Sequence, residues 1–178
     1  MATILIVSGS LRKDSLNTKL AHVWAASFAK NGTEVEVVAA DLLNVPLINQ
    51  DIEIPPSIKS LSDKIQLAKG VIICTPEYNG GISPVIKNAI DWSSTLRPHP
   101  WAGKPVLLSG TSPGALGAVS ALLHTRNPLD RLGAHVFPQS YGIPHGDKEL
   151  TGKTLEDPKK QEMLDSLAER FLGFCSKF

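Results

Sequence analysis

Short apolar runs alternate with helix-like stretches along this chain of 178 residues, and this alternation constrains its fold more than any other feature. Val71–Thr75, for example, is an apolar run of the kind found in strands that are covered on both faces. A strand, a helix and a further strand in succession predict a parallel sheet with right-handed crossovers. Five such units predict an α/β fold with a doubly wound sheet and helices on both faces, formed by the whole chain (residues 1–178) as one domain.

The boundaries of the elements follow from apolar periodicity and from turn residues. The expected strands are Thr3–Ser8, Glu34–Val38, Val71–Thr75, Pro105–Ser109 and Ala134–Phe137. The expected helices are Thr18–Asn31, Ser57–Ala68, Pro84–Ser93, Leu116–Leu132 and Pro158–Ser176. Pro128 falls inside the fourth of these helices and should kink or split it. Apolar spacing predicts the buried stripe of the first helix and of the last: Leu20, Val23, Trp24, Ser27 and Phe28, and Met163, Leu164, Leu167, Ala168, Phe171 and Leu172.

Composition excludes several classes of function. The formal net charge of +1 argues against a nucleic-acid partner and against a membrane surface. Cys74 and Cys175 have neither metal-ligand nor disulfide spacing, which predicts buried apolar roles and a cytoplasmic location. We expect no metal site, because the five histidines lack ligand spacing: His22, His99, His124, His135 and His145.

The loop after the first strand has more hydrogen-bond donors than an ordinary turn needs. A strand, a polar loop and a helix together aim backbone N–H groups and the positive helix end at one point. Ser10, Ser15, Asn17 and Thr18 add side-chain donors, and Arg12 adds a planar cation. The loop has neither the G-x-G-x-x-G pattern nor the Gly-Lys-Ser/Thr ending of nucleotide loops. It therefore predicts a site for an anion such as a phosphate.

The loop after the third strand, Thr75–Pro84, suits a flat ligand. Gly80 and Gly81 permit close approach of a ring to the backbone. Tyr78 offers an aromatic face, and Asn79 offers hydrogen bonds to ring heteroatoms. An ordinary turn rich in Pro, Asn and Gly would explain the glycines equally well, but it would not explain the aromatic ring or the carboxylate of Glu77.

The loop after the fourth strand matches the G-x-S-x-G pattern of hydrolase nucleophiles at Gly110–Gly114. Asp130 and His145 follow Ser112 in the order that a serine hydrolase requires. The residue after the nucleophile must donate its N–H to the oxyanion, and Pro113 has no N–H. A small polar loop against the edge of a ligand ring fits these residues better than a hydrolase site.

Two of these stretches resemble motifs of the NADPH-dependent FMN reductase family, which has a flavodoxin-like fold (strand order 2-1-3-4-5) and includes quinone and chromate reductases. Residues 9–17, GSLRKDSLN, are similar to its phosphate motif G-S-x-R-x-x-S-x-N. Residues 75–92, TPEYNGGISPVIKNAIDW, are similar to its flavin-ring motif. The resemblance extends over nearly the whole chain, although the helix after the fourth strand departs from the more usual glycine-rich sequence.

The resemblance implies a role for each matching residue. Ser10, Arg12, Ser15 and Asn17 would hold the FMN phosphate. Pro76, Glu77, Tyr78 and Asn79, with Gly80, would line the isoalloxazine ring and the ribityl chain, and Ser112 and Gly114 would border the far edge of the ring. It also implies a dimer or tetramer with contacts in Pro84–Trp101, where Ile86, Ile90, Trp92 and Trp101 are either interface or core residues.

The implied activity is that of an FMN-dependent NAD(P)H oxidoreductase. NAD(P)H would be the co-substrate, a quinone or another small acceptor such as chromate or free flavin would take the electrons, and flavin N5 rather than a side chain would carry the chemistry. Two alternatives stay open: an electron carrier of the flavodoxin type, and a flavin-binding regulatory module. The balance of 17 acidic against 18 basic residues speaks against a carrier, which docks through an acidic face.

Overall fold

A parallel sheet runs through the part of the chain that the computed structural model describes, residues 3–38 and 40–178. Its strands are β1 (Ile4–Ser8), β2 (Val35–Val38), β3 (Gly70–Thr75), β4 (Pro105–Thr111), β5 (His135–Val136) and β6 (Tyr141–Ile143). The order is β2-β1-β3-β4-β5, and β6 pairs with the carboxyl half of β4. This order confirms the predicted flavodoxin-like fold.

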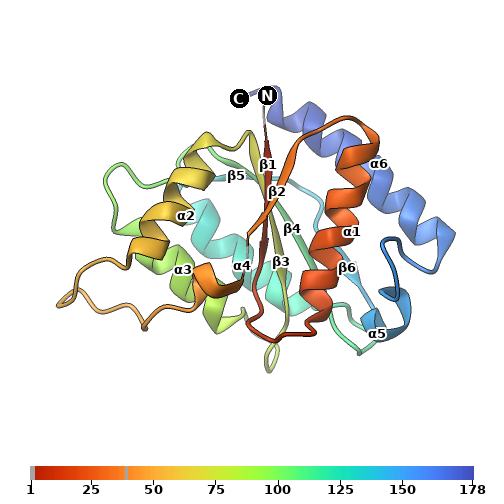
Figure 1. Cartoon of the computed structure of the whole chain (residues 1–178), viewed down its shortest axis with the longest axis horizontal. Helices are drawn as coiled ribbons and strands as arrows, with labels where there is room; N and C mark the ends of the chain where they lie inside the picture. Colours follow the sequence, from red (N-terminus) through yellow and green to blue (C-terminus); the bar gives the residue numbers. More distant parts are fainter. Residues whose placement is uncertain (1–2, 39) are drawn as a thin grey trace.

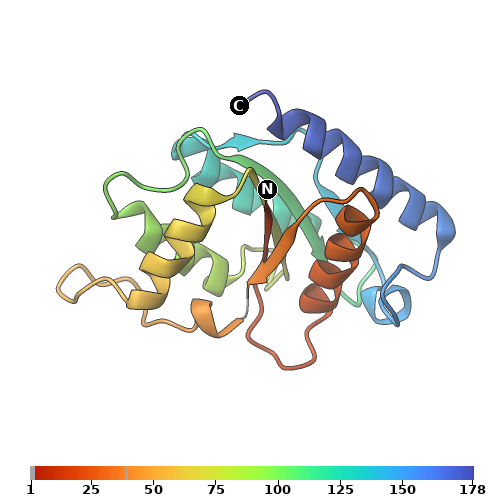
Figure 2. The same cartoon turned by 45° about the horizontal axis from the view of Figure 1, so that its top comes forward.

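Helices cover both faces of the sheet. α1 (Leu16–Lys30) and α6 (Pro158–Cys175) lie on one face. The other face is covered by α2 (Pro56–Leu67), α3 (Pro84–Ser94) and α4 (Val119–Arg131). In Figure 1, α1 and α6 stand to the right of the strands, α2 and α3 stand to the left, and α4 passes behind. Figure 2 shows α6 crossing near the upper end of α1, which it contacts. The remaining helices, η1 (Ala40–Leu43) and α5 (Gly146–Glu149), are single turns.

The core has two halves because successive side chains of a strand point to opposite faces. Ile4 and Ile6 of β1 pack toward α1 and α6, whereas Leu5 and Val7 pack toward α2 and α3. The predicted stripe of α1 is confirmed, since all five of its members are buried. The carboxyl ends of β1, β3 and β4 therefore meet at one edge of the sheet, between two rigid layers of helices.

The fourth helix begins three residues later than predicted, at Val119 instead of Leu116. Gly117 and Ala118 have φ angles of 58° and 62°, a left-handed conformation that an α-helix does not include. The three residues 116–118 thus belong to the loop that leaves β4.

The same helix continues through Pro128 to Arg131, so the predicted split is wrong. Pro128 lies in the last turn, where its missing N–H removes only the bond to the carbonyl of His124. Leu129 is fully buried in the core, and the amide of Leu132 donates to the Pro128 carbonyl at 3.1 Å. These contacts hold the last turn in place.

Two short elements, β6 and α5, were not expected from the sequence. The predicted strand Ala134–Phe137 is reduced to the two residues of β5, and the chain then returns to β4 as β6. A segment of only three residues has little strand propensity of its own. β6 is instead stabilised by its pairing with β4 and by the Tyr141 hydroxyl, which donates to the Lys160 carbonyl.

The buried face of α6 is confirmed for Leu164, Leu167, Ala168 and Phe171 but is wrong for Met163, which is 54% exposed. Apolar spacing identifies a stripe but not its width. Met163 stands beside the stripe that packs on α1.

The apolar side chains of Pro84–Trp101 are core residues. Ile86, Ile90, Trp92 and Trp101 are each at most 3% exposed. The indole N–H of Trp92 donates to the Pro46 carbonyl, and that of Trp101 donates to the Ser93 hydroxyl. Since these side chains are buried within one chain, they are not available for contacts with a second copy. Cys74 and Cys175 are also buried, as predicted.

Candidate functional site

Three loops enclose a hollow at the carboxyl edge of the sheet. They connect β1 to α1, β3 to α3 and β4 to α4. The hollow has a volume of about 140 Å³ and is lined by Ser10, Arg12, Ser15, Leu16, Asn17, Pro76, Glu77, Tyr78, Thr111, Ser112 and Pro113. A second hollow of about 350 Å³ continues from it across Ser10, Arg12 and Tyr78 to Leu11, Pro84 and Val85. Ligand pockets of proteins start at roughly 300 Å³, so a flavin-sized ligand would extend over both.

The first loop presents hydroxyl groups at the start of α1. Ser15 is the N-cap, and its Oγ accepts from the amides of Asn17 and Thr18. The Ser10 Oγ accepts from the amide of Arg12 at 3.4 Å. Both hydroxyls are used only as acceptors here, so each keeps a hydrogen to donate. Within residues 3–38 and 40–178 the Arg12 guanidinium makes no hydrogen bond and no ion pair.

Asn17 joins the first loop to the third. Its Nδ2 donates to the Thr111 carbonyl and its Oδ1 accepts from the Thr111 amide, each at 3.1 Å. The side chain is buried and both of its polar atoms have partners. Asn17 therefore lines the hollow but positions a neighbouring loop. Thr18 does not line the hollow, and its hydroxyl lies 2.9 Å from the Ser8 hydroxyl.

Glu77 joins the second loop to α4. Its Oε2 accepts from the amides of Ser120 at 2.9 Å and Ala121 at 3.1 Å. These are orphan N–H groups of the first turn of α4, and the positive end of the helix favours a carboxylate there. The carboxylate thus caps a helix, and the rest of the residue forms part of the wall of the hollow.

The tip of the second loop is a tight turn. Tyr78 and Gly81 exchange two backbone hydrogen bonds, and Asn79 and Gly80 between them have φ angles of 51° and 71°. This left-handed pair is typical of a type I′ turn, and the Asn-Gly sequence favours it. Tyr78 is 48% exposed and borders both hollows, whereas Asn79 and Gly80 lie at the exposed tip and do not line either.

The third loop does not form a hydrolase triad. Ser112 and Pro113 line the hollow, as expected for a wall, but Gly114 does not. Asp130 lies in the last turn of α4, about 16 Å along the helix axis from Val119 at 1.5 Å per residue. The helix thus carries Asp130 away from the edge where Ser112 lies.

The Cys74 thiol, near the carboxyl end of β3, is not suited to act as a nucleophile. Burial raises the pKa of the Cys74 thiol, which keeps it protonated. The described part of the chain contains no group of three or more His, Cys, Asp or Glu side chains that could hold a metal ion. Among the helices of residues 3–38 and 40–178, none has both the length and the apolar composition that a membrane crossing requires.

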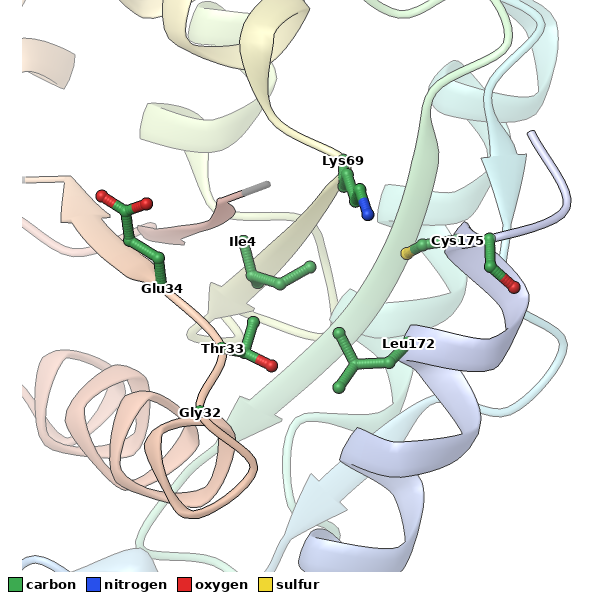
Figure 3. Close-up of a pocket in the computed structure, with 8 residues that line it drawn as sticks. Ile4, Gly32, Thr33, Glu34, Lys69, Leu172 and Cys175 are labelled. Carbon is green, nitrogen blue, oxygen red and sulfur yellow. The ribbon is translucent and has the colours of Figure 1, made fainter. Parts of the chain in front are cut away.

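A separate cavity of about 280 Å³ lies at the opposite edge of the sheet, near the start of β1. Figure 3 shows the side chains of Lys69 and Cys175 reaching toward the same space, with Leu172 and Thr33 beside them. Burial raises the pKa of the Cys175 thiol to about 11, although the charges of Lys104 and Lys69 oppose this shift. This cavity lacks the polar loop and the helix N-terminus of the first site.

The sequence therefore predicted most of the lining of the hollow. Eight expected residues meet there: Ser10, Arg12, Ser15, Asn17, Pro76, Glu77, Tyr78 and Ser112. Thr18, Asn79, Gly80 and Gly114 do not line it. Sequence reasoning missed Leu16, Thr111 and Pro113 as lining residues of the first hollow, and Leu11 and Val85 as lining residues of the second. The only signal for these is that they are neighbours of motif residues in the chain.

Comparison with known proteins identifies the family that the sequence motifs resemble. The family model for NADPH-dependent FMN reductase matches residues 2–148. The chain is 41% identical to a 2-hydroxy-1,4-benzoquinone reductase of a Burkholderia species, over 93% of each chain. It is 34% identical to a quinone reductase of Escherichia coli, over 96% of this chain and 92% of that one.

Among solved structures, the flavoenzyme FerB of Paracoccus denitrificans, an NAD(P)H:(acceptor) oxidoreductase, superposes with a TM-score of 0.87 at 32% identity. The match covers 99% of this chain and 98% of FerB. The fold, the three loops at the carboxyl edge and these matches lead to one conclusion: the chain belongs to the NADPH-dependent FMN reductase family.

Proposed function

We propose that this protein is an FMN-dependent NAD(P)H oxidoreductase that reduces quinones, acting as a single FMN-binding domain. The observation that carries the proposal is the unpaired guanidinium of Arg12, which stands with two serine hydroxyls at the N-terminus of α1. This arrangement suits a phosphate monoester. The family membership and the quinone reductases among the relatives support the reaction class.

The donor set fits FMN as a resident cofactor. Ser10, Arg12 and Ser15 would hold its phosphate, with Asn17 keeping the loop in place. Pro76, Glu77 and Tyr78 would line the ring and the ribityl chain, with Asn79 and Gly80 at the rim. Ser112 and Gly114 would border the far edge of the ring. The 15 residues of α1 give this end a full helix dipole.

When bound, FMN supplies the transfer of a hydride equivalent from NAD(P)H to the acceptor. The protein's part is to orient the ring and leave one face open. Tyr78 is half exposed at the outer hollow, where Leu11, Pro84 and Val85 add apolar surface for a flat acceptor. The proposed reaction requires no side chain at this edge as an acid or base. This agrees with the protonated thiol of Cys74 and with Glu77, whose carboxylate caps α4.

The first prediction concerns cofactor choice and kinetics. The protein should bind FMN at least tenfold more tightly than FAD, because the loop provides one phosphate site. Steady-state turnover with NAD(P)H and a quinone should give parallel double-reciprocal plots, since both substrates use the same ring face. Titration of the apoprotein with each flavin checks the first point. Equal affinity for FAD would contradict the assignment.

Ser112→Ala tests the hydrolase alternative. If Ser112 only forms part of the wall, the variant should keep most of its quinone reduction. Flavin binding without any NAD(P)H oxidation would instead support an electron carrier or a regulatory module.

We also propose a cytoplasmic location, because the two cysteines are not paired in a disulfide.

We also propose that the protein forms a homo-oligomer. Because the apolar residues of Pro84–Trp101 are buried, another surface has to supply the contact. Leu116 in the loop before α4, and Val119 and Leu123 on α4, are 70%, 44% and 64% exposed. Val119 and Leu123 lie four residues apart, on one face of the helix. Light scattering should give a multiple of the chain mass for the wild type and a smaller species for Leu123→Lys. Leu67→Lys on α2, where Leu67 is 85% exposed, is the control. A monomeric wild type would contradict the proposal.

A further inference from the structure

Strained backbone gathers around the candidate site. In residues 3–38 and 40–178, the non-glycine residues with positive φ are Asn79, Ala118 and His145. Each follows the carboxyl end of a different strand: β3, β4 and β6. A left-handed conformation costs about 1 kcal/mol for a residue with a Cβ, and such residues concentrate at functional sites. Asn79 lies in the type I′ turn, Ala118 is the N-cap of α4, and His145 is the N-cap of the single turn α5. Of the three, His145 is the one whose ring also contacts the third loop.

His145 and Gly146 hold the third loop by its carbonyl groups. The amide of Gly146 donates to the Ser112 carbonyl at 2.9 Å, and the amide of His145 donates to the Gly114 carbonyl at 3.0 Å. Between them, His145 Nδ1 lies 3.2 Å from the Pro113 carbonyl. A carbonyl only accepts, so Nδ1 must carry the hydrogen. With the bond from Asn17 to Thr111, four successive carbonyls of this loop have partners outside it.

The left-handed φ of 53° at His145 belongs to the conformation in which its amide and its ring both face this loop. Gly146 has to be a glycine, because a Cβ there would overlap the Thr111 hydroxyl. Within the described ranges, the amides of Ser112 and Gly114 donate to no protein group. His145 and Gly146 thus pair with the carbonyls of Ser112, Pro113 and Gly114. The amides of Ser112 and Gly114 have no partner among the described residues and remain available to a ligand.

We infer that His145 is a positioning residue for the flavin-ring edge, holding the loop Ser112–Gly114 so that its amides face the bound ring. The inference rests on the proposed function. It gives His145 no direct contact with the ring and no part in proton transfer. Its effect should therefore appear in ring binding and not in phosphate binding.

Three variants separate the hydrogen bond from the strained backbone. His145→Gly relieves the backbone strain but removes the side-chain donor. His145→Asn keeps a side-chain donor and tolerates positive φ. His145→Ala has no side-chain donor and keeps the backbone strain. The Kd of FMN and of riboflavin should both rise about three- to tenfold in His145→Gly and His145→Ala. His145→Asn should stay near the wild type. The thermal midpoint of His145→Gly should not fall, which excludes simple unfolding.

The tautomer supplies a readout that does not need flavin. Nitrogen NMR of the flavin-free protein should show a hydrogen on His145 Nδ1. An Nδ1 without a hydrogen, an unchanged riboflavin Kd in His145→Gly, or an equal loss in the Asn and Gly variants would each overturn the inference. If the proposed function is wrong, the wild type would bind neither flavin, whatever the tautomer of His145. The role of His145 at the ring edge would then be wrong as well.

Discussion

Arg12→Ala should weaken FMN binding by about ten- to a hundredfold. Charge-assisted hydrogen bonds contribute about 1.5–3 kcal/mol, and about 1.4 kcal/mol corresponds to a factor of ten in Kd. The guanidinium has no partner among the described residues, so its loss should leave the fold unchanged. Titration of the apoprotein, followed by flavin fluorescence, measures the effect.

Riboflavin provides the internal control for Arg12, because it has the ring but no phosphate. Its Kd should be the same in Arg12→Ala and in the wild type. Lys13→Ala, which removes the neighbouring exposed cation, is the matched variant and should change FMN binding little. An FMN Kd that is unchanged in Arg12→Ala would remove Arg12 from the phosphate site.

Asn17→Ala should cause a large loss of stability. The substitution leaves the amide and the carbonyl of Thr111 buried without partners, and each such group costs about 1–3 kcal/mol. A total of about 2–6 kcal/mol corresponds to a fall of about 4–24 °C in Tm for a chain of this size. FMN binding should weaken as well, since the first and third loops lose their direct connection.

Asn49→Ala is the control for this stability effect. Asn49 is exposed, and its side chain accepts only a local hydrogen bond, from the amide of Asp51. Its Tm should stay close to that of the wild type. If Asn17→Ala and Asn49→Ala melt at the same temperature, the contact between Asn17 and Thr111 does not support the site in solution.

The fold was predictable because its central strands, β1, β3 and β4, are buried on both faces. Runs such as Val71–Thr75 identify the strands, and the rule that parallel strands share a carboxyl edge brings the three loops together. The elements that were missed depend on partners. β6 forms because Tyr141–Ile143 pairs with β4, and α4 survives Pro128 because Leu129 is anchored in the core.

The residues of the candidate site were largely predictable, but the contacts that each side chain makes were not. The motif residues Asn17 and Glu77 were expected to bind a ligand. Both polar atoms of the Asn17 side chain bond to backbone groups of β4, and Oε2 of Glu77 accepts from backbone amides of α4. Those partners are 94 and 43 residues away in the sequence, and local patterns carry no information over such separations. Arg12 makes no ion pair with any carboxylate of the described residues, although Asp14 lies two positions further along the loop. Its guanidinium is therefore free to bind an anion.

One measurement tests the central proposal most directly. The FMN-loaded protein is mixed with NADH or NADPH in the absence of oxygen, and then with benzoquinone, while the flavin absorbance is followed. The account predicts that the absorbance bleaches with at least one of the two nucleotides and returns on addition of the quinone, each at a rate no slower than steady-state turnover. An absorbance that neither nucleotide bleaches, or that the quinone does not restore, would contradict it.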